Sequence, residues 1–280
     1  MSILVFGRTG QVARELQRAG MVTALGRAEA DLSDPAACAA AIHVARPDCV
    51  INAAAYTAVD RAEDEDALAR TINAEAPGAM ARACADLGIP FLHISTDYVF
   101  DGQGEAPWQT DDATAPINAY GRSKLAGEEA VRASGANAAI LRTSWVFSAH
   151  GANFVKTMLR LSETRDALSV VGDQIGGPTP AAAIAEALLT MAGAMTNGQP
   201  GGIYHFAGTP AVSWHGFAAE IFRMAGRDVA LTSIPTSDYP TPAQRPLNSR
   251  LDCAALATDF GIEPPDWRAG LRAVFKELGT

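Results

Sequence analysis

The stretch Ile3-Leu-Val-Phe-Gly-Arg-Thr-Gly-Gln-Val-Ala13 decides the fold. Four apolar residues predict a buried strand, and a glycine-rich turn follows them and opens a helix. In this dinucleotide fingerprint Gly7 permits the tight turn, Gly10 lets a pyrophosphate approach the backbone, and Ala13 lets the helix pack on the strand. The pyrophosphate would then lie at the positive end of the helix. The stretch therefore predicts a dinucleotide-binding unit.

Short apolar runs alternate with helical stretches through the rest of the first half. Strands are predicted at 3–6, 22–25, 49–52, 91–95 and 139–142, and helices at 11–18, 35–45, 74–87 and 120–133. Such alternation with continuous apolar strands is typical of a parallel sheet covered on both faces. Right-handed crossovers then make it a doubly wound, Rossmann-type α/β fold.

The second half of the chain is less regular. Proline and glycine gather at 176–180, 198–202 and 239–242, and helices are predicted at 181–195, 214–224 and 266–278. We expect a smaller C-terminal α/β lobe that closes over the carboxyl edge of the sheet, where ligands of open α/β sheets bind. The predicted division is a Rossmann domain over 1–168 and a mostly substrate-binding domain over 169–280, partly interleaved with the first.

Composition narrows the class of protein. The 280 residues are 48% hydrophobic and 19% charged, which excludes a disordered scaffold. The formal charge is −9 without a dense Lys/Arg cluster, so we expect no nucleic-acid partner. The longest apolar stretch, 181–195, contains Glu186 and is too short to span a membrane. We expect a cytoplasmic protein with no membrane partner, whose four cysteines are reduced core thiols.

The turn after the second strand bears on the choice of cofactor. Leu25-Gly-Arg27 has no carboxylate to hold the adenosine ribose hydroxyls and repel a 2′-phosphate. Arg27, helped by Arg8, is expected to pair with that phosphate, the alternative being that both arginines are merely solvated. The turn therefore favours NADPH, with NADH as the alternative. Asp31 and Leu32 are expected to flank the adenine, with Asp31 accepting a hydrogen bond from its amino group.

A Tyr-x-x-x-Lys pair opens the helix predicted at 120–133. Tyr120 and Lys124 lie one turn apart on one face, and the ammonium is expected to lower the tyrosine pKa from about 10 toward neutrality. The same ammonium can hold the nicotinamide ribose. A snorkelling surface pair is the alternative, but Ser95-Thr96 at the end of the fourth strand supplies a hydroxyl that can meet the tyrosine at a substrate carbonyl. We therefore predict that Thr96, Tyr120 and Lys124 are catalytic.

The third strand completes the predicted cofactor site. It ends in Asn52-Ala-Ala-Ala55, whose small side chains leave room for the central ribose and phosphates. The residues expected to contact the cofactor are Gly7, Arg8, Thr9, Gly10, Gln11, Val12, Arg27, Asp31, Leu32, Ala53, Ala54, Ala55, Tyr56, Thr57, Tyr120 and Lys124. The sequence has no Gly-x-Ser-x-Gly elbow and no metal-binding histidine spacing. His93 lies in an apolar strand and is predicted to be a hydrogen-bonded core residue.

These blocks resemble the extended short-chain dehydrogenase/reductases, and more closely the dTDP-4-dehydrorhamnose reductase family, nearly from end to end. The blocks that carry the resemblance lie at 7–12, 52–60, 95–102, 120–128, 141–147, 153–158 and 242–249. Thr-Ser-Trp-Val at 143–146 and Arg-Pro-Leu-Asn-Ser at 245–249 are the most specific to that family.

The resemblance implies reduction of the C4 keto group of dTDP-4-dehydro-L-rhamnose to dTDP-L-rhamnose, the last step in the synthesis of that sugar nucleotide. It implies that Tyr120 donates a proton to the carbonyl oxygen as hydride arrives from the nicotinamide. The implied substrate contacts are Thr96, Asp97 and Trp145 at the sugar, and Asn153 and Arg245 at the diphosphate. An Arg245 that only anchors its proline-rich loop to an acid is the alternative.

Members of the resembled family suggest one metal site to consider and two alternative functions. Some family members dimerise around magnesium held by three glutamates. Glu15 and Glu277 match two of these, but Ala182 stands at the third, so we expect no metal, and a monomer or a homodimer. A sugar-nucleotide epimerase shares the fold, as does the non-catalytic regulatory subunit of methionine adenosyltransferase. The intact catalytic residues argue against the non-catalytic alternative.

Overall fold

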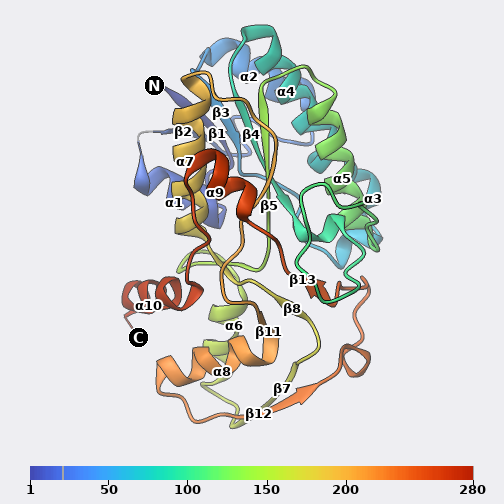
Figure 1. The fold of residues 1–280 in the computed structure, drawn as a ribbon, viewed down its shortest axis with the longest axis vertical. Helices are drawn as coiled ribbons and strands as arrows, with labels where there is room; N and C mark the ends of the chain where they lie inside the picture. The colour runs from blue at the N-terminus through green and yellow to red at the C-terminus, as the bar shows by residue number, and fades with distance from the viewer. Residues whose placement is uncertain (21, 280) are drawn as a thin grey trace.

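The computed structural model describes residues 1–20 and 22–279. A parallel sheet of six strands in the order β10-β5-β4-β3-β1-β2 forms the upper part of the molecule (Figure 1). Its strands are β1 (Ile3–Phe6), β2 (Val22–Leu25), β3 (Cys49–Asn52), β4 (Phe91–Thr96), β5 (Ala138–Thr143) and β10 (Ile203–His205). The strand order reverses at β1, because β2 lies on one side of it and β3 on the other. This confirms the predicted doubly wound, Rossmann-type α/β fold.

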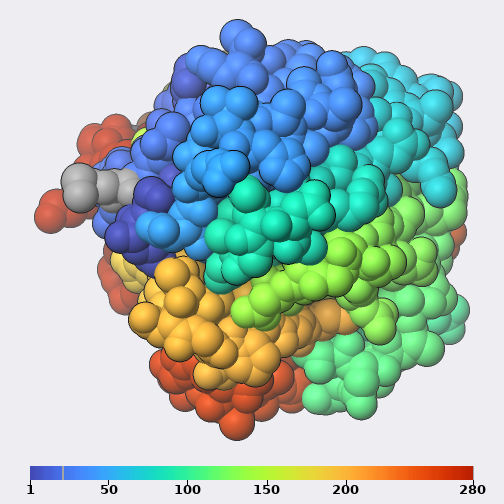
Figure 2. Space-filling model, turned by 90° about the horizontal axis from the view of Figure 1, so that it is seen from above, coloured from blue at the N-terminus to red at the C-terminus, as the bar shows by residue number. Residues whose placement is uncertain are grey.

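Helices cover both faces of this sheet. One face carries α1 (Gln11–Ala19) and α7 (Ala181–Thr196), and the other carries α2 (Pro35–Ala45), α4 (Ala76–Leu87) and α5 (Ala119–Arg132). Val5 of β1 packs with Leu16 and Leu188, whereas its neighbour Leu4 packs with Ile42 on the opposite face, because side chains alternate along a strand. Seen from above, the blue-to-green first half of the chain and the gold α7 form most of this end (Figure 2).

A smaller lobe lies below the sheet, and the chain enters it directly from the carboxyl end of β5 (Figure 1). Its helices are α6 (Phe154–Leu161), α8 (Trp214–Ala225) and α10 (Trp267–Leu278). Its strands are β6 (Val146–Phe147), β7 (Ala167–Val171), β8 (Ile175–Gly176), β9 (Thr179–Pro180), β11 (Val212–Ser213), β12 (Ala230–Ile234) and β13 (Asn248–Ser249). The core of this lobe is largely aromatic, with Phe147, Phe217 and Trp267 fully buried. It therefore has a hydrophobic core of its own.

The two parts exchange chain segments. α7, β10 and α9 (Ala254–Phe260) come after residue 168, yet they pack with the main sheet. α6 comes before residue 168 and packs in the smaller lobe. Segments far apart in the sequence therefore meet at the carboxyl edge of the sheet.

The helix predicted at 74–87 is the end of a longer helical run. α3 (Asp66–Arg70) continues through a π-helical turn (Thr71–Glu75) into α4. The turn directs Asn73 inward, where its amide accepts the Tyr56 N–H at 2.8 Å and donates to the Ser123 hydroxyl at 2.9 Å. A π turn re-aims side chains in this way at many functional sites. Here it ties the segment after β3 to α5.

Within the described residues, no helix combines the length and the apolar character that crossing a bilayer requires. The four cysteines are free and buried, as predicted for core thiols. Burial raises the pKa of the Cys38 thiol to about 11 and that of the Cys49 thiol to about 12.

Candidate active site

Two of the predicted catalytic residues meet where the carboxyl end of β4 approaches the start of α5. β4 ends at Thr96 and continues into a 3-10 turn, η3 (Asp97–Val99). The Thr96 hydroxyl accepts the Tyr98 N–H at 3.2 Å and donates to Asp97 Oδ1 at 3.0 Å. The Thr96 hydroxyl also lies close enough to the Tyr120 phenol to lower its pKa. The structure thus brings a hydroxyl from a strand and a phenol from a helix together.

The position of Tyr120 depends on the two residues around it. Asn118 caps α5 by accepting the Gly121 N–H at 2.7 Å, so the helix begins just before the tyrosine. Gly121 lets α5 approach η3, because a Cβ there would lie 2.2 Å from the carbonyl oxygen of Tyr98. The rings of Tyr98 and Tyr120 then meet edge to face, with centroids 5.6 Å apart. A larger residue at position 121 would displace Tyr120 from Thr96.

Lys124 lies one turn further along α5 and is buried. Its Nζ donates to the carbonyl oxygen of Ile94 at 2.7 Å and lies 3.3 Å from His93 Nε2. Burial lowers the pKa of Lys124 to about 8, and the negative charge of Glu128 opposes that shift. The lysine can therefore gain and lose a proton close to neutral pH.

The structure corrects the predicted effect of Lys124 on Tyr120. Burial raises the pKa of Tyr120 above its usual value, and the nearby Thr96 hydroxyl opposes that rise. The amino group of Lys124 is directed at the Ile94 carbonyl of β4, which explains why it does not dominate the phenol. Tyr120 is consequently held as a neutral phenol, the form that can donate a proton.

Asp97 places a buried carboxylate beside these hydroxyls. Burial raises the pKa of Asp97 to about 6, while hydrogen bonds from Ser249 and Thr96 lower it. Within the described part of the chain, its Oδ2 atom has no hydrogen-bond partner. Leaving a buried carboxylate oxygen unpaired costs free energy. This atom is therefore available to accept a hydrogen bond from a ligand hydroxyl.

A buried ion pair supports α5, and the sequence analysis missed it. Arg142 of β5 donates to the two carboxylate oxygens of Glu128 at 2.9 and 2.7 Å, and Ser95 donates to the same carboxylate at 2.6 Å. The side chains of the pair are only 3% and 2% exposed, so each charge depends on the other. Two features of the sequence could have revealed this ion pair. One is an arginine inside an apolar strand, and the other is a glutamate one turn after Lys124.

The fingerprint turn has the predicted geometry. Gly7 has a φ of +101°, and its N–H donates to the Leu25 carbonyl at 2.9 Å. A Cβ on Gly7 would lie 3.3 Å from the backbone of Ala53, so the turn runs against the end of β3. Gly10 caps α1 in an extended conformation, and Ala13 is fully buried. The predicted roles of Gly7 in the turn and of Ala13 in packing are confirmed.

An acid does lie at the turn after β2, contrary to the expectation from its sequence. Glu29 reaches back, so that its carboxylate accepts the Gly26 N–H at 3.0 Å and pairs with Arg8 at 2.7 Å. Arg27 has a side chain that is 78% exposed and lies 3.4 Å from Asp31. The sequence analysis considered the residues that close the strand and overlooked a glutamate three positions further on.

The other predicted cofactor residues differ in exposure. Val12 is buried, Gln11, Ala53, Ala54 and Tyr56 are half-buried, and Thr9, Gly10, Ala55 and Thr57 are exposed. Leu32 is largely buried in the core cluster that also contains Phe6 and Ile42. Asp31 is expected to accept a hydrogen bond from the adenine amino group. In this structure its carboxylate accepts the N–H of Ser33 at 2.9 Å, which stabilises the turn after β2.

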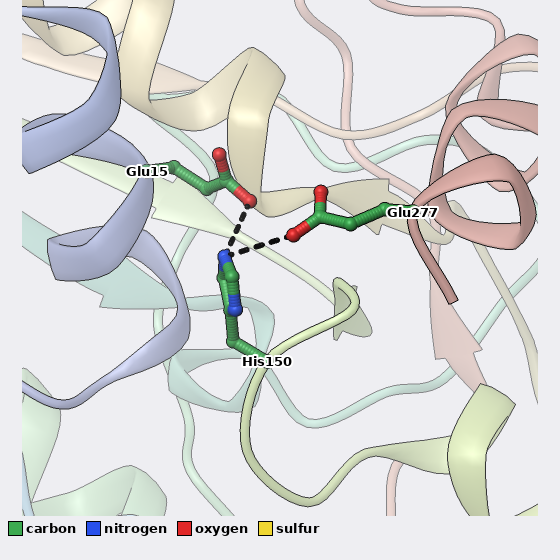
Figure 3. Close-up of side chains that lie close together, drawn as sticks. All are labelled: Glu15, His150 and Glu277. Carbon is green, nitrogen blue, oxygen red and sulfur yellow. Dashed lines mark ion pairs between the residues drawn. The ribbon is translucent and has the colours of Figure 1, made fainter. Parts of the chain in front are cut away.

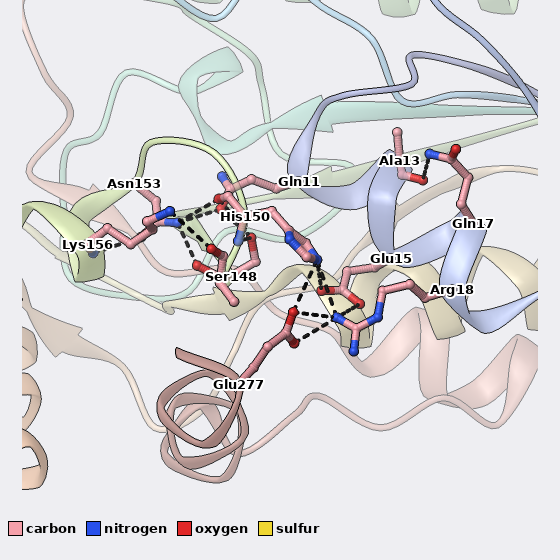
Figure 4. Close-up of polar contacts among 11 residues, drawn as sticks. Gln11, Ala13, Glu15, Gln17, Arg18, Ser148, His150, Asn153, Lys156 and Glu277 are labelled. Atoms are coloured by element: carbon pink, nitrogen blue, oxygen red, sulfur yellow. Dashed lines mark hydrogen bonds and ion pairs between the residues drawn. The ribbon is translucent and has the colours of Figure 1, made fainter. Parts of the chain in front are cut away.

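Asn153, predicted to contact the diphosphate, forms hydrogen bonds within the fold in this structure. Its side chain caps α6 by accepting the Lys156 N–H at 3.1 Å, and it donates to Gln11 Oε1 at 2.9 Å (Figure 4). The Ser148 hydroxyl donates to the same Gln11 oxygen at 2.9 Å. These bonds use the donors and acceptors of the Asn153 amide, and they connect the smaller lobe to the fingerprint helix.

Trp145 and Arg245 both lie where the two parts of the molecule meet. Trp145 has a φ of +49°, which residues other than glycine rarely adopt, and its ring stacks on Trp214 with centroids 3.6 Å apart. Arg245 pairs with Asp60 at 2.8 Å, which is the anchoring role given above as the alternative. Its other terminal nitrogen lies 3.5 Å from the hydroxyl of Tyr98, whose ring packs on Tyr120.

Comparison with known proteins places this arrangement in a family. The family model described as RmlD substrate binding domain matches residues 1–280. A dTDP-4-dehydrorhamnose reductase of Burkholderia thailandensis is 46% identical, with 99% of each chain covered. The chain belongs to the dTDP-4-dehydrorhamnose reductase family.

Solved structures of this reductase family have the same fold. A dTDP-4-dehydrorhamnose reductase of Clostridium acetobutylicum superposes with a TM-score of 0.94 at 37% identity and covers 100% of both chains. That of Bacillus anthracis, solved in complex with NADP, has a TM-score of 0.92 at 34% identity and covers 99% of both chains. The resemblance drawn from the sequence motifs is confirmed.

The residues of this reductase that match the family's magnesium glutamates are already paired. Among the described residues, Glu15, His150 and Glu277 lie together, with His150 Nε2 3.3 Å from Glu15 and 3.6 Å from Glu277 (Figure 3). Arg18 donates to the two oxygens of Glu277 at 2.8 and 2.7 Å and lies 3.5 Å from Glu15 (Figure 4). Magnesium prefers oxygen ligands in octahedral geometry. The guanidinium supplies the positive charge here, so these residues do not fit a magnesium ion.

Proposed function

We propose that the protein reduces the C4 keto group of dTDP-4-dehydro-L-rhamnose to dTDP-L-rhamnose with NADPH. The observation that carries the proposal is the contact between Thr96 and Tyr120 at the carboxyl edge of a sheet that also bears a dinucleotide fingerprint. The names of the full-length relatives support the substrate. The NADP in the Bacillus anthracis structure supports the cofactor.

The protonation states in the site assign the chemical roles. NADPH, when bound, supplies the hydride. Tyr120 donates a proton to the carbonyl oxygen of the substrate, because burial keeps it as a phenol. Thr96 stabilises the same oxygen when its hydroxyl proton turns from Asp97 Oδ1 to the substrate, in the manner of an oxyanion-binding donor. Lys124 holds the nicotinamide ribose. While the lysine is protonated, it also keeps a positive charge near Tyr120.

The substrate is proposed to lie between the sheet edge and the smaller lobe. The Oδ2 atom of Asp97, which has no partner among the described residues, accepts a hydrogen bond from a hydroxyl of the sugar. The Trp145–Trp214 stack forms an apolar wall of the substrate site. Arg245, which is 29% exposed and also held by Asp60, contributes positive charge toward the diphosphate. In this proposal residues 1–168 mainly bind the cofactor, and residues 169–280 mainly complete the substrate site.

The proposal is tested by incubating the purified protein with dTDP-4-dehydro-L-rhamnose and NADPH. We expect one NADPH to be oxidised for each molecule of keto sugar reduced, which is followed as a fall in the absorbance of the reduced nicotinamide. An epimerase retains its cofactor through both half-reactions and would show no net loss. A non-catalytic relative would show neither cofactor loss nor a new sugar nucleotide. Either result would refute the proposed reduction.

Cofactor preference provides a second test, at the turn after β2. Glu29 places a carboxylate beside Arg8, whereas the exposed Arg27 has only a 3.4 Å ion pair with Asp31 and can meet a 2′-phosphate. We expect Glu29→Gln to lower KM for NADPH by about threefold to tenfold, because it removes a repelling charge and releases Arg8. We expect Arg27→Ala to raise the same KM by a similar factor. KM for NADH measured in parallel is the control, and equal changes for the two cofactors would contradict both roles.

We also propose that the protein acts in the cytoplasm as a monomer or a homodimer, without a nucleic-acid or membrane partner. The acidic composition, and the absence of a dense basic cluster from the sequence, argue against a nucleic-acid partner. The pairing of Glu15 and Glu277 with Arg18 supports assembly that does not depend on a metal. Light scattering of the protein in EDTA and in magnesium would show whether its mass depends on the ion.

A further inference from the structure

His93 occupies the space between β3 and the catalytic lysine, and the proposed reaction does not yet use it. The ring is fully buried in β4. Its Nδ1 atom lies 3.1 Å from Nδ2 of Asn52, and its Nε2 atom lies 3.3 Å from Nζ of Lys124. Both ring nitrogens therefore face a group that carries N–H donors. A neutral imidazole can accept at only one of them.

The direction of the hydrogen bond at Nδ1 follows from the backbone. The Ala54 N–H donates to Oδ1 of Asn52 at 3.1 Å, and a backbone N–H can only donate. That contact orients the amide so that its Nδ2 group faces the imidazole. Nδ2 must donate, so Nδ1 of His93 must accept. Asn52 thereby selects one tautomer of the ring.

The proton of the neutral ring is consequently on Nε2. Burial and the charge of Lys124 lower the pKa of His93 well below its usual value, so the ring is neutral near pH 7. Its Nε2–H then points at Nζ of Lys124. An ammonium has three donors and no lone pair, so it cannot accept this N–H, whereas a neutral amine can. The contact favours the amine over the ammonium.

The groups around Lys124 leave this preference in place. The Ile94 carbonyl accepts from Nζ at 2.7 Å, which either form of the lysine can satisfy. Glu128, on the same helix, favours the ammonium, but Arg142 and Ser95 already bind its carboxylate. Tyr120, on the same helix, is neutral as a phenol.

The buried His205 shows the opposite arrangement and serves as an internal comparison. Its Nδ1 lies 3.0 Å from the carbonyl oxygen of Trp108, so Nδ1 must donate. Its Nε2 therefore carries a lone pair, and it faces the guanidinium of Arg142 at 3.4 Å. A histidine beside a fixed cation thus presents an acceptor, whereas the histidine beside Lys124 presents a donor.

We propose that His93, held in the Nε2–H tautomer by Asn52, is a positioning residue that stabilises the neutral amine of Lys124 and so sets the pH at which the lysine loses its positive charge. This rests on the proposed function, in which Tyr120 loses one proton to the substrate oxygen as C4 gains a hydride from NADPH. The Tyr120 phenolate then takes one proton from solvent, which restores the site and balances the reaction. Lys124 transfers no proton in this step, and its positive charge stabilises the phenolate until the proton arrives.

The first test reads the tautomer without turnover. Long-range proton–nitrogen NMR spectra of histidine-labelled wild-type protein distinguish a protonated Nε2 from a protonated Nδ1. We expect His93 to show Nε2–H and His205 to show Nδ1–H, with His93→Gln identifying the first set of signals. A protonated Nδ1 on His93 would overturn the proposal even if the protein is an active reductase.

The second test reads the effect on Lys124. In the wild type the ammonium is lost as pH rises through the lysine pKa of about 8, so kcat/KM should fall on the alkaline side. His93→Gln can present a carbonyl oxygen to Lys124, which stabilises the ammonium, so we expect this alkaline limb to move up by about one pH unit.

The matched control for the second test is His205→Gln, which removes another buried imidazole. We expect it to leave the alkaline limb in place, whatever it does to thermal stability. A purely structural His93 would lower the melting temperature of His93→Gln with an unshifted limb, and that result would refute the inference. A wild-type protein without reductase activity would instead refute the proposed function, while the NMR result would stand by itself.

Discussion

Tyr120→Phe should lower kcat by at least about 100-fold, the usual scale for a lost general acid. The phenol is the proton donor in the proposed reaction, and burial keeps it protonated. Its ring packs edge to face on Tyr98, a contact that phenylalanine preserves. We therefore expect the fold and the affinity for NADPH to change little. Steady-state kinetics and a fluorescence titration with NADPH measure the two quantities separately.

Tyr98→Phe is the matched control for this variant. It removes a hydroxyl from the adjacent ring, where burial raises the phenol pKa to about 12. Only a long contact of 3.5 Å with Arg245 is lost. We expect its kcat to fall by less than about fivefold, since no proton transfer is assigned to it. Near-normal turnover by Tyr120→Phe, or an equal loss in both variants, would rule out Tyr120 as the proton donor.

Arg142→Leu should destabilise the protein by about 3–5 kcal/mol, because it leaves the buried carboxylate of Glu128 without its partner. The wild-type pair is nearly inaccessible to water, and the only other side chain shown donating to the carboxylate within the described residues is Ser95. For a chain of this size the loss corresponds to a fall in Tm of roughly 10 °C. Thermal unfolding followed by circular dichroism measures it.

Two comparisons separate the buried charge from other effects. The double variant Arg142→Leu with Glu128→Gln removes the stranded charge and should recover part of the lost stability. Arg223→Leu breaks an exposed pair with Glu220 at the same 2.7 Å separation, and we expect little change in Tm. If Arg142→Leu were no more harmful than Arg223→Leu, the pair would not support α5 as described.

Local spacing was enough to predict the parts of the site that depend on neighbouring residues. The turn at Gly7, the helix start at Tyr120 and the strand end at Thr96 follow from residue types within a few positions of one another. The predicted strands of the sheet agree with the structure because their apolar runs are continuous. The strand β10 and the helix α6 were not predicted, since β10 is very short and follows Gly201-Gly202, and α6 has little more than two turns.

The sequence alone thus determined the fold and the family, and it predicted the catalytic residues, all from short-range patterns. Only the tertiary structure decided what each buried or charged side chain contacts. Lys124 lies against His93 and the Ile94 carbonyl, and Arg18 pairs with Glu277 from the far end of the chain. Such pairings depend on how helices and strands pack, and on which donor faces which acceptor once water is excluded. Spacing along the chain does not carry that information.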